Sequence, residues 1–463
     1  MPNALATLAL VSFPALALWL FWRLPPGRAL LVVLVLGYLF LPPPPAGFDF
    51  PLMPPLTKQT IPNLSILAIC LVKYRGDLRL MPENPLARVL VLTFIFSPIG
   101  TVLTNMDPVY FDNFALPPLR LREAAAQCIN QFLLLSPFLV ARHFLRSRDD
   151  LRDMMFAMLF AGLVYSVPML IEVRLSPQLN IWIFGYFQHA FDQMIRDGGF
   201  RPIVFLYHGL WAAFLAMTAL MAAVIIARNS TSRSVVVWWI AAAYMAVVLV
   251  LCKSLASLLY ATAFAPMLLL LTVRAQLRVA LVLASLTLLY PAMKSVHLIP
   301  EARILSMAAN IDEERAGSLQ FRFENENILI DRAMERPVFG WGTWGRNQIY
   351  NGQTGELLTT TDGRWIITIG VYGWVGFLAE FGLLILPMGL AWQALRRREA
   401  PPSLWFGGVA IILAINMIDM IPNATLTPMT WLFSGALLGN AERVRRDVRQ
   451  RSDTRRAALR TIL

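Results

Sequence analysis

The chain has 463 residues, of which 57% are hydrophobic and only 15% are charged, and its mean hydropathy is +0.59. Soluble globular proteins are about 45–50% apolar and about 25% charged, so this composition excludes a disordered protein and argues against a water-soluble enzyme. The formal charge is +12, but the basic residues are diluted by long apolar segments. This distribution argues against nucleic-acid binding and favours a multi-pass membrane protein.

A helix that spans the hydrocarbon core of a bilayer needs about 20 mostly apolar residues. By that criterion the sequence predicts an all-α polytopic integral membrane protein with about 12–13 transmembrane helices. The second, third and thirteenth segments are short and need flanking residues, and Arg23 with Pro25 after the first segment argues against a cleavable signal peptide. The thirteen segments are 4–22, 29–41, 61–72, 89–103, 124–141, 154–172, 203–227, 235–252, 258–273, 279–299, 371–395, 404–420 and 426–438.

Lysine and arginine are distributed unevenly between the two sides of these segments. Alternate connections, together with the tail after the last segment, hold 25 of the 40 basic residues. The positive-inside rule makes that side cytoplasmic, with the N-terminus outside and the C-terminus inside. The expected division is ten transmembrane helices in 1–299, a large outer loop in 300–365, three more helices in 366–440 and a basic cytoplasmic tail in 441–463.

Two outer connections are too long to be simple turns. Residues 174–202 place several aromatic residues among polar ones, which predicts an amphipathic segment at the membrane interface. Residues 300–365 hold ten acidic residues and seven arginines. In this loop Ser318 is expected to cap a helix that ends near Glu335, before Pro337, and a Gly-rich, Trp-rich and Asn-rich loop follows over 340–355.

The sequence predicts neither a metal site nor a cofactor. The three cysteines lie in apolar segments without a CxxC pair, and the four histidines are scattered. Residues 340–345 match the pattern G-x-G-x-x-G, but a helix rather than a strand precedes them and they face outward. We expect a tight loop whose tryptophans pack on the membrane surface or on a sugar.

Three cations are expected at the outer membrane interface, namely Arg201, Lys253 and Arg322. Cations at that depth are costly unless they reach water, pair with an acid or bind an anion. Each of them alone could anchor a helix end, and Arg322 could pair with Glu326 one turn later. Together they favour an anionic, lipid-linked substrate, because a guanidinium binds a diphosphate through two hydrogen bonds.

Three stretches follow one another in a recognisable order around the large outer loop. They are Arg201 to His208-Gly209 at the start of a span, Ser318 to Arg322 followed by the Pro337–Gly342 run, and the 362–377 segment that opens the next span. Over residues 195–395 the chain resembles the bacterial O-antigen ligase and polymerase superfamily. These are inner-membrane proteins that join or polymerise undecaprenyl-diphosphate-linked glycans at the periplasmic face.

The resemblance implies that Arg201 and Arg322 bind the lipid diphosphate of an undecaprenyl-diphosphate-linked oligosaccharide, in a glycosyltransferase that needs no metal. The sequence departs from the ligases in two places. Asp362, or alternatively Thr361, stands where they usually carry a histidine, and Glu-Asn-Glu at 324–326 replaces an aromatic residue expected after the loop arginine. A role for a histidine therefore does not carry over, and these departures favour a polymerase.

The expected reaction is attack by an acceptor sugar hydroxyl on the anomeric carbon of the donor. Arg201 and Arg322 would stabilise the departing diphosphate, and Asp362 or Glu324 would accept the proton. Tryptophans near the site would stack on sugars or anchor the loop at the interface, and His208 and Glu172 would act as supporting groups. The expected substrate-binding residues are Lys253, His208, Arg364, Trp341, Trp344 and Trp365.

Three functions remain open from the sequence. The first is a polymerase of O-antigen or exopolysaccharide, with membrane lipids and a chain-length regulator as further partners. The second is a ligase that transfers a finished glycan to lipid A core or another acceptor. The third is a transporter of the lipid-linked glycan, because such proteins also handle this substrate. Transporters tend to show inverted repeats and midplane charges. This chain has no clear repeat and its charged groups collect at the outer face, whereas Asp419, near the outer end of the twelfth span, would line a cavity together with Asn416.

Overall fold

The computed structural model is mostly helical, with almost no sheet, and confirms an all-α polytopic membrane protein. All thirteen apolar segments coincide with helices, and seven of the helices in the described part of the chain are long and apolar enough to cross a membrane. The thirteenth segment forms the first part of α16. The residues that the structure describes are 1–50, 53–196, 198–231, 234–310, 313–397 and 403–462.

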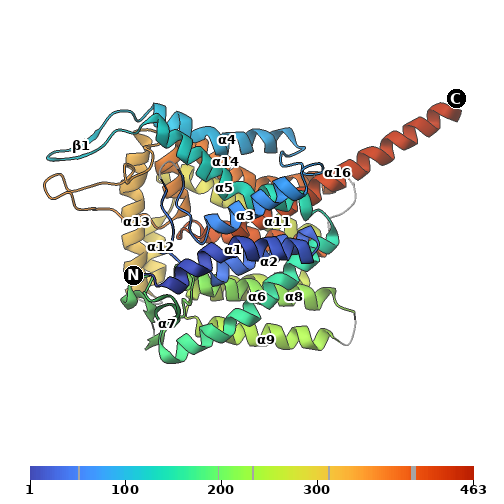
Figure 1. The fold of residues 1–463 in the computed structure, drawn as a ribbon, viewed down its shortest axis with the longest axis horizontal. Coiled ribbons are helices and arrows are strands. Elements are labelled where there is room, and N and C mark those ends of the chain that lie inside the picture. The colour runs from blue at the N-terminus through green and yellow to red at the C-terminus, as the bar shows by residue number, and fades with distance from the viewer. Residues whose placement is uncertain (51–52, 197, 232–233, 311–312, 398–402, 463) are drawn as a thin grey trace.

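The helices of the bundle lie side by side along one direction (Figure 1). The seven long ones are α1 (Ala4–Arg23), α4 (Pro85–Leu103), α5 (Leu121–Phe144), α6 (Arg148–Leu175), α8 (Gly209–Asn229), α11 (Val273–Ser295) and α14 (Arg364–Arg396). The shorter apolar helices are α2 (Pro26–Phe40), α3 (Thr60–Lys73), α9 (Val235–Leu251), α10 (Leu255–Leu270) and α15 (Leu404–Asp419).

The two ends of the bundle carry different segments of the chain (Figure 1). One end, which also holds the N-terminus, carries α7 (Leu179–Phe184), α12 (Glu301–Ala309) and α13 (Glu313–Met334), and α13 runs across it. From the other end α16 (Pro428–Ile462) projects with the C-terminus. The expected separate tail 441–463 is therefore a continuation of this helix, and the side chains of 451–463 lie outside the described part. We call the end with α13 the loop end.

The connection 174–202 is less regular than a single amphipathic segment. It contains the six-residue α7, the short 3-10 helix η1 (Phe191–Met194) and the paired strands β3 (Ile195–Arg196) and β4 (Gly199–Phe200). Trp182 is exposed, whereas Phe184 and Tyr186 are buried. Only part of the aromatic set is thus available to a membrane surface, because the rest packs into the bundle.

The large loop also differs from expectation in detail. Its long helix α13 begins at Glu313 rather than at Ser318, so the predicted cap is wrong, while its end at Met334 agrees. A hairpin of β1 (Val109–Phe111) and β2 (Phe114–Leu116), which the sequence did not predict, lies beside this loop. The Asn113 N–H donates to the Gly352 carbonyl over 2.9 Å, which joins the two segments.

The chain after α13 is inserted against a break in α14. At Gly373 the backbone of α14 is not helical, with φ 65° and ψ −168°. The N–H of Trp374 donates to Pro337 O over 2.8 Å, and Trp341 N–H donates to Gly370 O over the same distance. The break leaves backbone N–H and C=O groups of α14 without helical partners, and the loop supplies the hydrogen-bond partners for them.

The G-x-G-x-x-G pattern has a structural explanation at this contact. Gly340, Gly342 and Gly345 all have positive φ, between 69° and 85°. A Cβ on Gly340 would lie 2.6 Å from Val371 O. Glycine is needed because the turn is left-handed and because the two backbones approach closely.

Replacing Gly373 with alanine should destabilise the protein. Its φ and ψ belong to a region that is essentially restricted to glycine, at a cost of about 1–3 kcal/mol, and a Cβ would lie 2.3 Å from Val338 O. Thermal unfolding in detergent should show a clearly lower melting temperature for Gly373→Ala. Gly389→Ala in the same helix is the matched control, because no heavy atom lies within 4 Å of its added Cβ. Equal melting temperatures for the two variants would contradict the interpretation of the break.

Candidate functional site

Two of the expected catalytic residues meet at the loop end. Arg322 on α13 and Asp362, just before α14, form an ion pair with 3.3 Å between Nε and Oδ2. Both side chains are about one third exposed, at 35% and 39%. Arg322 does not pair with Glu326, as the sequence suggested, because Glu326 turns to Lys294 on α11. Helix α13 thus brings together residues that are 40 positions apart.

Glu324 does not belong to this group. Two helical positions correspond to about 200° of rotation, so Glu324 points away from the side of α13 that carries Arg322. Its side chain is exposed and accepts a hydrogen bond from Gln320 over 2.8 Å. The structure therefore does not bring Glu324 together with Arg322 and Asp362, and its expected role as proton acceptor stays a prediction.

The other two expected cations also lie together. Arg201 follows β4 and is 8% exposed, and its Nη2 donates to the carbonyl of Lys253 over 3.0 Å. Lys253 lies between α9 and α10 with φ 51°, and its Nζ donates to Arg196 O over 2.9 Å. The connection before α8 and the connection after α9 therefore hold each other through these two hydrogen bonds.

A set of buried polar side chains fixes the backbone between Arg201 and α8. Glu172 Oε2 accepts from the N–H groups of Ile203 and Val204, over 2.8 and 2.7 Å. The Tyr165 hydroxyl and the Lys58 ammonium bond to the N–H and the carbonyl of Phe205. These contacts hold residues 203–205 outside the helix, so α8 begins at Gly209 rather than at 203. Glu172 thus orders the backbone next to Arg201, and its role as a supporting group of the reaction stays a prediction. Lys58 was not singled out in the sequence.

His208 caps the N-terminus of α8, and Arg201 and Arg322 both act on it electrostatically. Its Nδ1 accepts from Leu210 N–H over 3.0 Å, so the ring proton is on Nε2. Burial lowers the pKa of His208 to about 3, helped by the positive charges of His189, Arg201 and Arg322. The ring is therefore neutral near pH 7, and it marks the place where Arg201 and Arg322 act on the same group.

Arg364 already has an acidic partner. Its Nε and Nη2 donate to the two carboxylate oxygens of Glu380 over 2.7 and 2.5 Å, and Glu380 is fully buried within α14. This bidentate pair accounts for the burial of an acid inside a spanning helix. Arg364 was expected to bind substrate, but in this structure its guanidinium fixes the start of α14.

The three tryptophans differ in their exposure. Trp341 is 6% exposed, donates through Nε1 to Arg332 O over 2.6 Å and lies under the Arg332 guanidinium at 3.4 Å. Trp365 is fully buried and packs edge to face on Tyr290. Neither ring can stack on a sugar in this arrangement, so that expectation is wrong for both. Trp344 is 70% exposed and remains available.

A buried ionic cluster, which the sequence analysis missed, fastens α12 and α13 to the bundle. Lys294 near the end of α11 is 1% exposed, and its Nζ lies 2.5 Å from Glu301 and 3.3 Å from Glu326. The Tyr290 hydroxyl donates to Glu326 over 2.9 Å. Burial raises the pKa of Glu326, and the charge of Lys294 opposes that rise. The sequence does contain a signal for this cluster, namely a lysine near the end of an apolar segment with an acid seven residues later.

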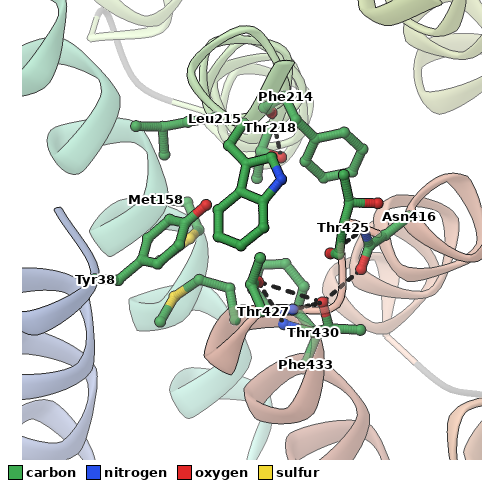
Figure 2. Close-up of a pocket in the computed structure, with 12 residues that line it drawn as sticks. Tyr38, Met158, Phe214, Leu215, Thr218, Asn416, Thr425, Thr427, Thr430 and Phe433 are labelled. Carbon is green, nitrogen blue, oxygen red and sulfur yellow. Dashed lines mark hydrogen bonds between the residues drawn. The ribbon is translucent and has the colours of Figure 1, made fainter. Parts of the chain in front are cut away.

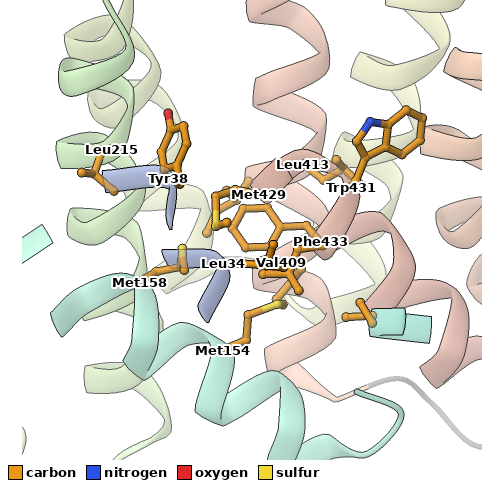
Figure 3. Close-up of a cluster of buried hydrophobic side chains, with 14 of the residues drawn as sticks. Leu34, Tyr38, Met154, Met158, Leu215, Val409, Leu413, Met429, Trp431 and Phe433 are labelled. Carbon is orange, nitrogen blue, oxygen red and sulfur yellow. The ribbon is translucent and has the colours of Figure 1, made fainter. Parts of the chain in front are cut away.

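A small cavity lies in the bundle, between α2, α6, α8, α15 and the start of α16 (Figure 2). Its volume is about 30 Å³, which suits one or two water molecules rather than a sugar ring. On one wall Thr430 donates to Asn416 Oδ1 and Asn416 donates to Thr425 O. Closely packed apolar side chains, including Leu34 and Met154, fill the neighbouring interior (Figure 3). The candidate site is therefore at the loop end and not in this cavity.

The described residues hold no group of three or more His, Cys, Asp or Glu side chains placed to bind a metal ion. No family model matches the chain, and no curated protein matches it. The function of the site therefore has to come from its own side chains.

Replacing His208 tests its role as the N-cap of α8. Asparagine is also a strong N-cap residue, whereas alanine loses about 1 kcal/mol of capping. We expect His208→Ala to lower the melting temperature and His208→Asn to leave it near that of the wild type at pH 7.

The same variants test the charge state of His208. The folded pKa is depressed, so the unfolded chain binds more protons below pH 6.5, and the contribution to stability is complete above that pH and lost on acidification. The melting temperature of the wild type should fall more between pH 7 and pH 5 than that of His208→Asn. Parallel pH curves would show that the ring is not held neutral.

Proposed function

We propose that this chain is a polymerase of a surface polysaccharide, either O-antigen or exopolysaccharide. It would transfer glycan from an undecaprenyl-diphosphate donor to a sugar hydroxyl of the acceptor at the periplasmic face of the bacterial inner membrane. The single observation that carries the proposal is the Arg322–Asp362 ion pair at the loop end, where the field of Arg322 and that of Arg201 meet at His208.

The main contribution of this site to the proposed reaction is positive charge. Arg322 is partly exposed and can be reached from the bundle end, whereas Arg201 is nearly buried beside Lys253. A diphosphate that leaves an anomeric carbon gains negative charge in the transition state. Fixed guanidinium groups stabilise that charge, and they cost little reorganisation because their positions are set beforehand.

The reaction also needs an acceptor for a proton. The attacking hydroxyl forms a bond to the anomeric carbon, the bond from that carbon to the phosphate oxygen breaks, and the hydroxyl proton must leave. With Glu324 turned away, the proton acceptor has to be a carboxylate beside Arg322. Trp344 supports the recognition of sugar, since its exposed ring offers a face on which a pyranose can stack.

The loop end is proposed to be periplasmic, and the positive-inside rule supports this orientation. The basic connections lie at the end opposite to α13, and α16 leaves from that same end (Figure 1). The N-terminus would accordingly be periplasmic and the C-terminus cytoplasmic.

Reporter fusions test this orientation. Alkaline phosphatase folds only after export, so an insertion after the exposed Gln353 should be active and one after Thr231 should be inactive. A green fluorescent protein at the C-terminus should be fluorescent, because it matures in the cytoplasm. The reverse pattern would contradict the proposed sidedness.

The substitution Arg322→Ala tests the site itself. It should abolish high-molecular-weight polymer, at least 100-fold, because removing a charge that stabilises the leaving group costs about 10²–10³ in rate. Arg303→Ala on the neighbouring α12 is the matched control, since this arginine is exposed. Polymer is measured by gel electrophoresis at equal protein level. Normal polymer in Arg322→Ala would refute the assignment.

A deletion strain decides which transfer is catalysed. A polymerase defect leaves single repeat units, whereas a ligase defect leaves long lipid-linked chains without a capped acceptor. We expect single repeat units, because Asp362 occupies the position where the ligases usually carry a histidine.

A further inference from the structure

The partly exposed ion pair of the candidate site lies in front of a buried polar support. Arg322 and Asp362 are 35% and 39% exposed, and ion pairs that water can reach contribute little to holding their own geometry. The side chains behind them are buried, with Thr359 2% exposed and Asn325 8% exposed. The geometry of the pair therefore depends on what fixes the segment 359–362, which carries the aspartate.

Helix α13 fixes this segment through Asn325, which lies one turn after Arg322. Residues three apart lie on the same side of a helix. Asn325 Oδ1 accepts from the Thr360 N–H over 2.8 Å, and Asn325 Nδ2 donates to Phe321 O over the same distance. The second hydrogen bond orients the amide so that Oδ1 faces the segment. One turn of α13 thus carries the guanidinium and also holds the backbone two residues before its partner.

The loop after α13 fixes the segment at a second place, through Gln348. The Nε2 of Gln348 donates to Thr361 Oγ1 over 3.2 Å, and its Oε1 accepts from Thr359 Oγ1 over 2.7 Å. The Ile349 N–H donates to the same Thr359 oxygen over 3.1 Å. One glutamine therefore bridges the two threonines on either side of Thr360, and both ends of its amide are engaged.

The backbone after Asp362 is fixed as well. The N–H of Arg364 donates to Met420 O over 2.9 Å. A Cβ on Gly363 would clash with the carbonyl oxygen of Ile421, so the chain passes close to this turn. Asp362 therefore lies between two anchored stretches of backbone, and its carboxylate meets α13 from a fixed position.

We propose that Gln348 and Asn325 are positioning residues for the transfer, which hold Asp362 so that its carboxylate keeps Arg322 in place for the diphosphate. This inference rests on the proposed function. Neither residue is a catalytic residue, because both amides are engaged with the segment 359–362. In the proposed reaction the guanidinium has to be in position before charge develops on the leaving group, since moving it later would cost reorganisation. The two amides supply this order without adding a charge beside the arginine.

The test uses the purified full-length protein and, as donor, the lipid-linked oligosaccharide that accumulates in the deletion strain. Gln348→Met keeps the length of the side chain and removes both of its hydrogen bonds. It should lower the rate of donor consumption about 10-fold or more, because a displacement of about 1 Å can cost about 10²-fold in rate. Gln353→Met is the matched control, since Gln353 is exposed on the same loop, and it should consume the donor at the wild-type rate.

A double-mutant cycle separates positioning from general support of the fold. In the Asp362→Asn protein the ion pair is already lost, so adding Gln348→Met should lower the rate by less than about 2-fold. A merely structural role would lower the rate by the same factor in both backgrounds. Asn325→Leu should behave like Gln348→Met, and Asn325→Asp should recover most of the rate, because its carboxylate still accepts from the Thr360 N–H.

Hydrogen exchange measured by mass spectrometry is a readout that does not depend on activity. Asn325 Oδ1 protects the Thr360 N–H, so Asn325→Leu should speed the exchange of this amide about 10-fold. The exchange of peptides from the spanning helices should stay at the wild-type rate.

Three results would overturn the positioning role. The first is wild-type donor consumption by both Gln348→Met and Asn325→Leu, and the second is an equal loss for Gln348→Met with Asp362 and with Asn at that position. The third is unchanged exchange over 359–363 in Asn325→Leu, which can be measured even where Asp362→Asn is too slow to assay. The proposed function fails separately, if Arg322→Ala consumes the donor as fast as the wild type.

Discussion

The insertion of the loop after α13 into the break of α14 is the contact on which the loop end depends. Without the break at Gly373, the carbonyls of Pro337 and Val338 would have no N–H partners in α14. With it, the C-terminal end of α13 is attached to a spanning helix. At the other side the buried Lys294 cluster attaches the middle of α13 to α11. A helix held at two points across the bundle end can carry Arg322 at a defined place over Asp362.

The arginines of the loop end fall into two groups according to their hydrogen-bond partners and their exposure. Arg346 is fully buried and donates to the carbonyls of Trp341, Pro117 and Asp107, and Arg364 is held by Glu380. Their hydrogen bonds are used to join chain segments, so they act as structural crosslinks. Arg322 differs, because about a third of its side chain is exposed and, among the described residues, it pairs with Asp362, which is exposed to a similar degree. In the proposed reaction, the diphosphate of the donor would compete for that partner.

Apolar length and charge asymmetry were enough to predict the spans and the two long connections, because both follow from the bilayer as a solvent. The pairings at the loop end were harder to predict. Arg322 and Glu326 are one turn apart on α13, a spacing that favours an ion pair, yet Lys294 takes Glu326 and leaves Arg322 to Asp362. The local sequence pattern also could not predict which tryptophans are exposed, because segments distant in sequence bury Trp341 and Trp365. Such competition is settled only by tertiary packing.

The buried residues beneath the cations explain why the site can stay fixed in the absence of a substrate. Glu172 accepts hydrogen bonds from the N–H groups of Ile203 and Val204. The Lys58 side chain donates to the carbonyl of Phe205, and the Tyr165 hydroxyl accepts from its N–H. These contacts order the backbone between Arg201 and α8, so the geometry around Arg201 does not depend on a bound ligand.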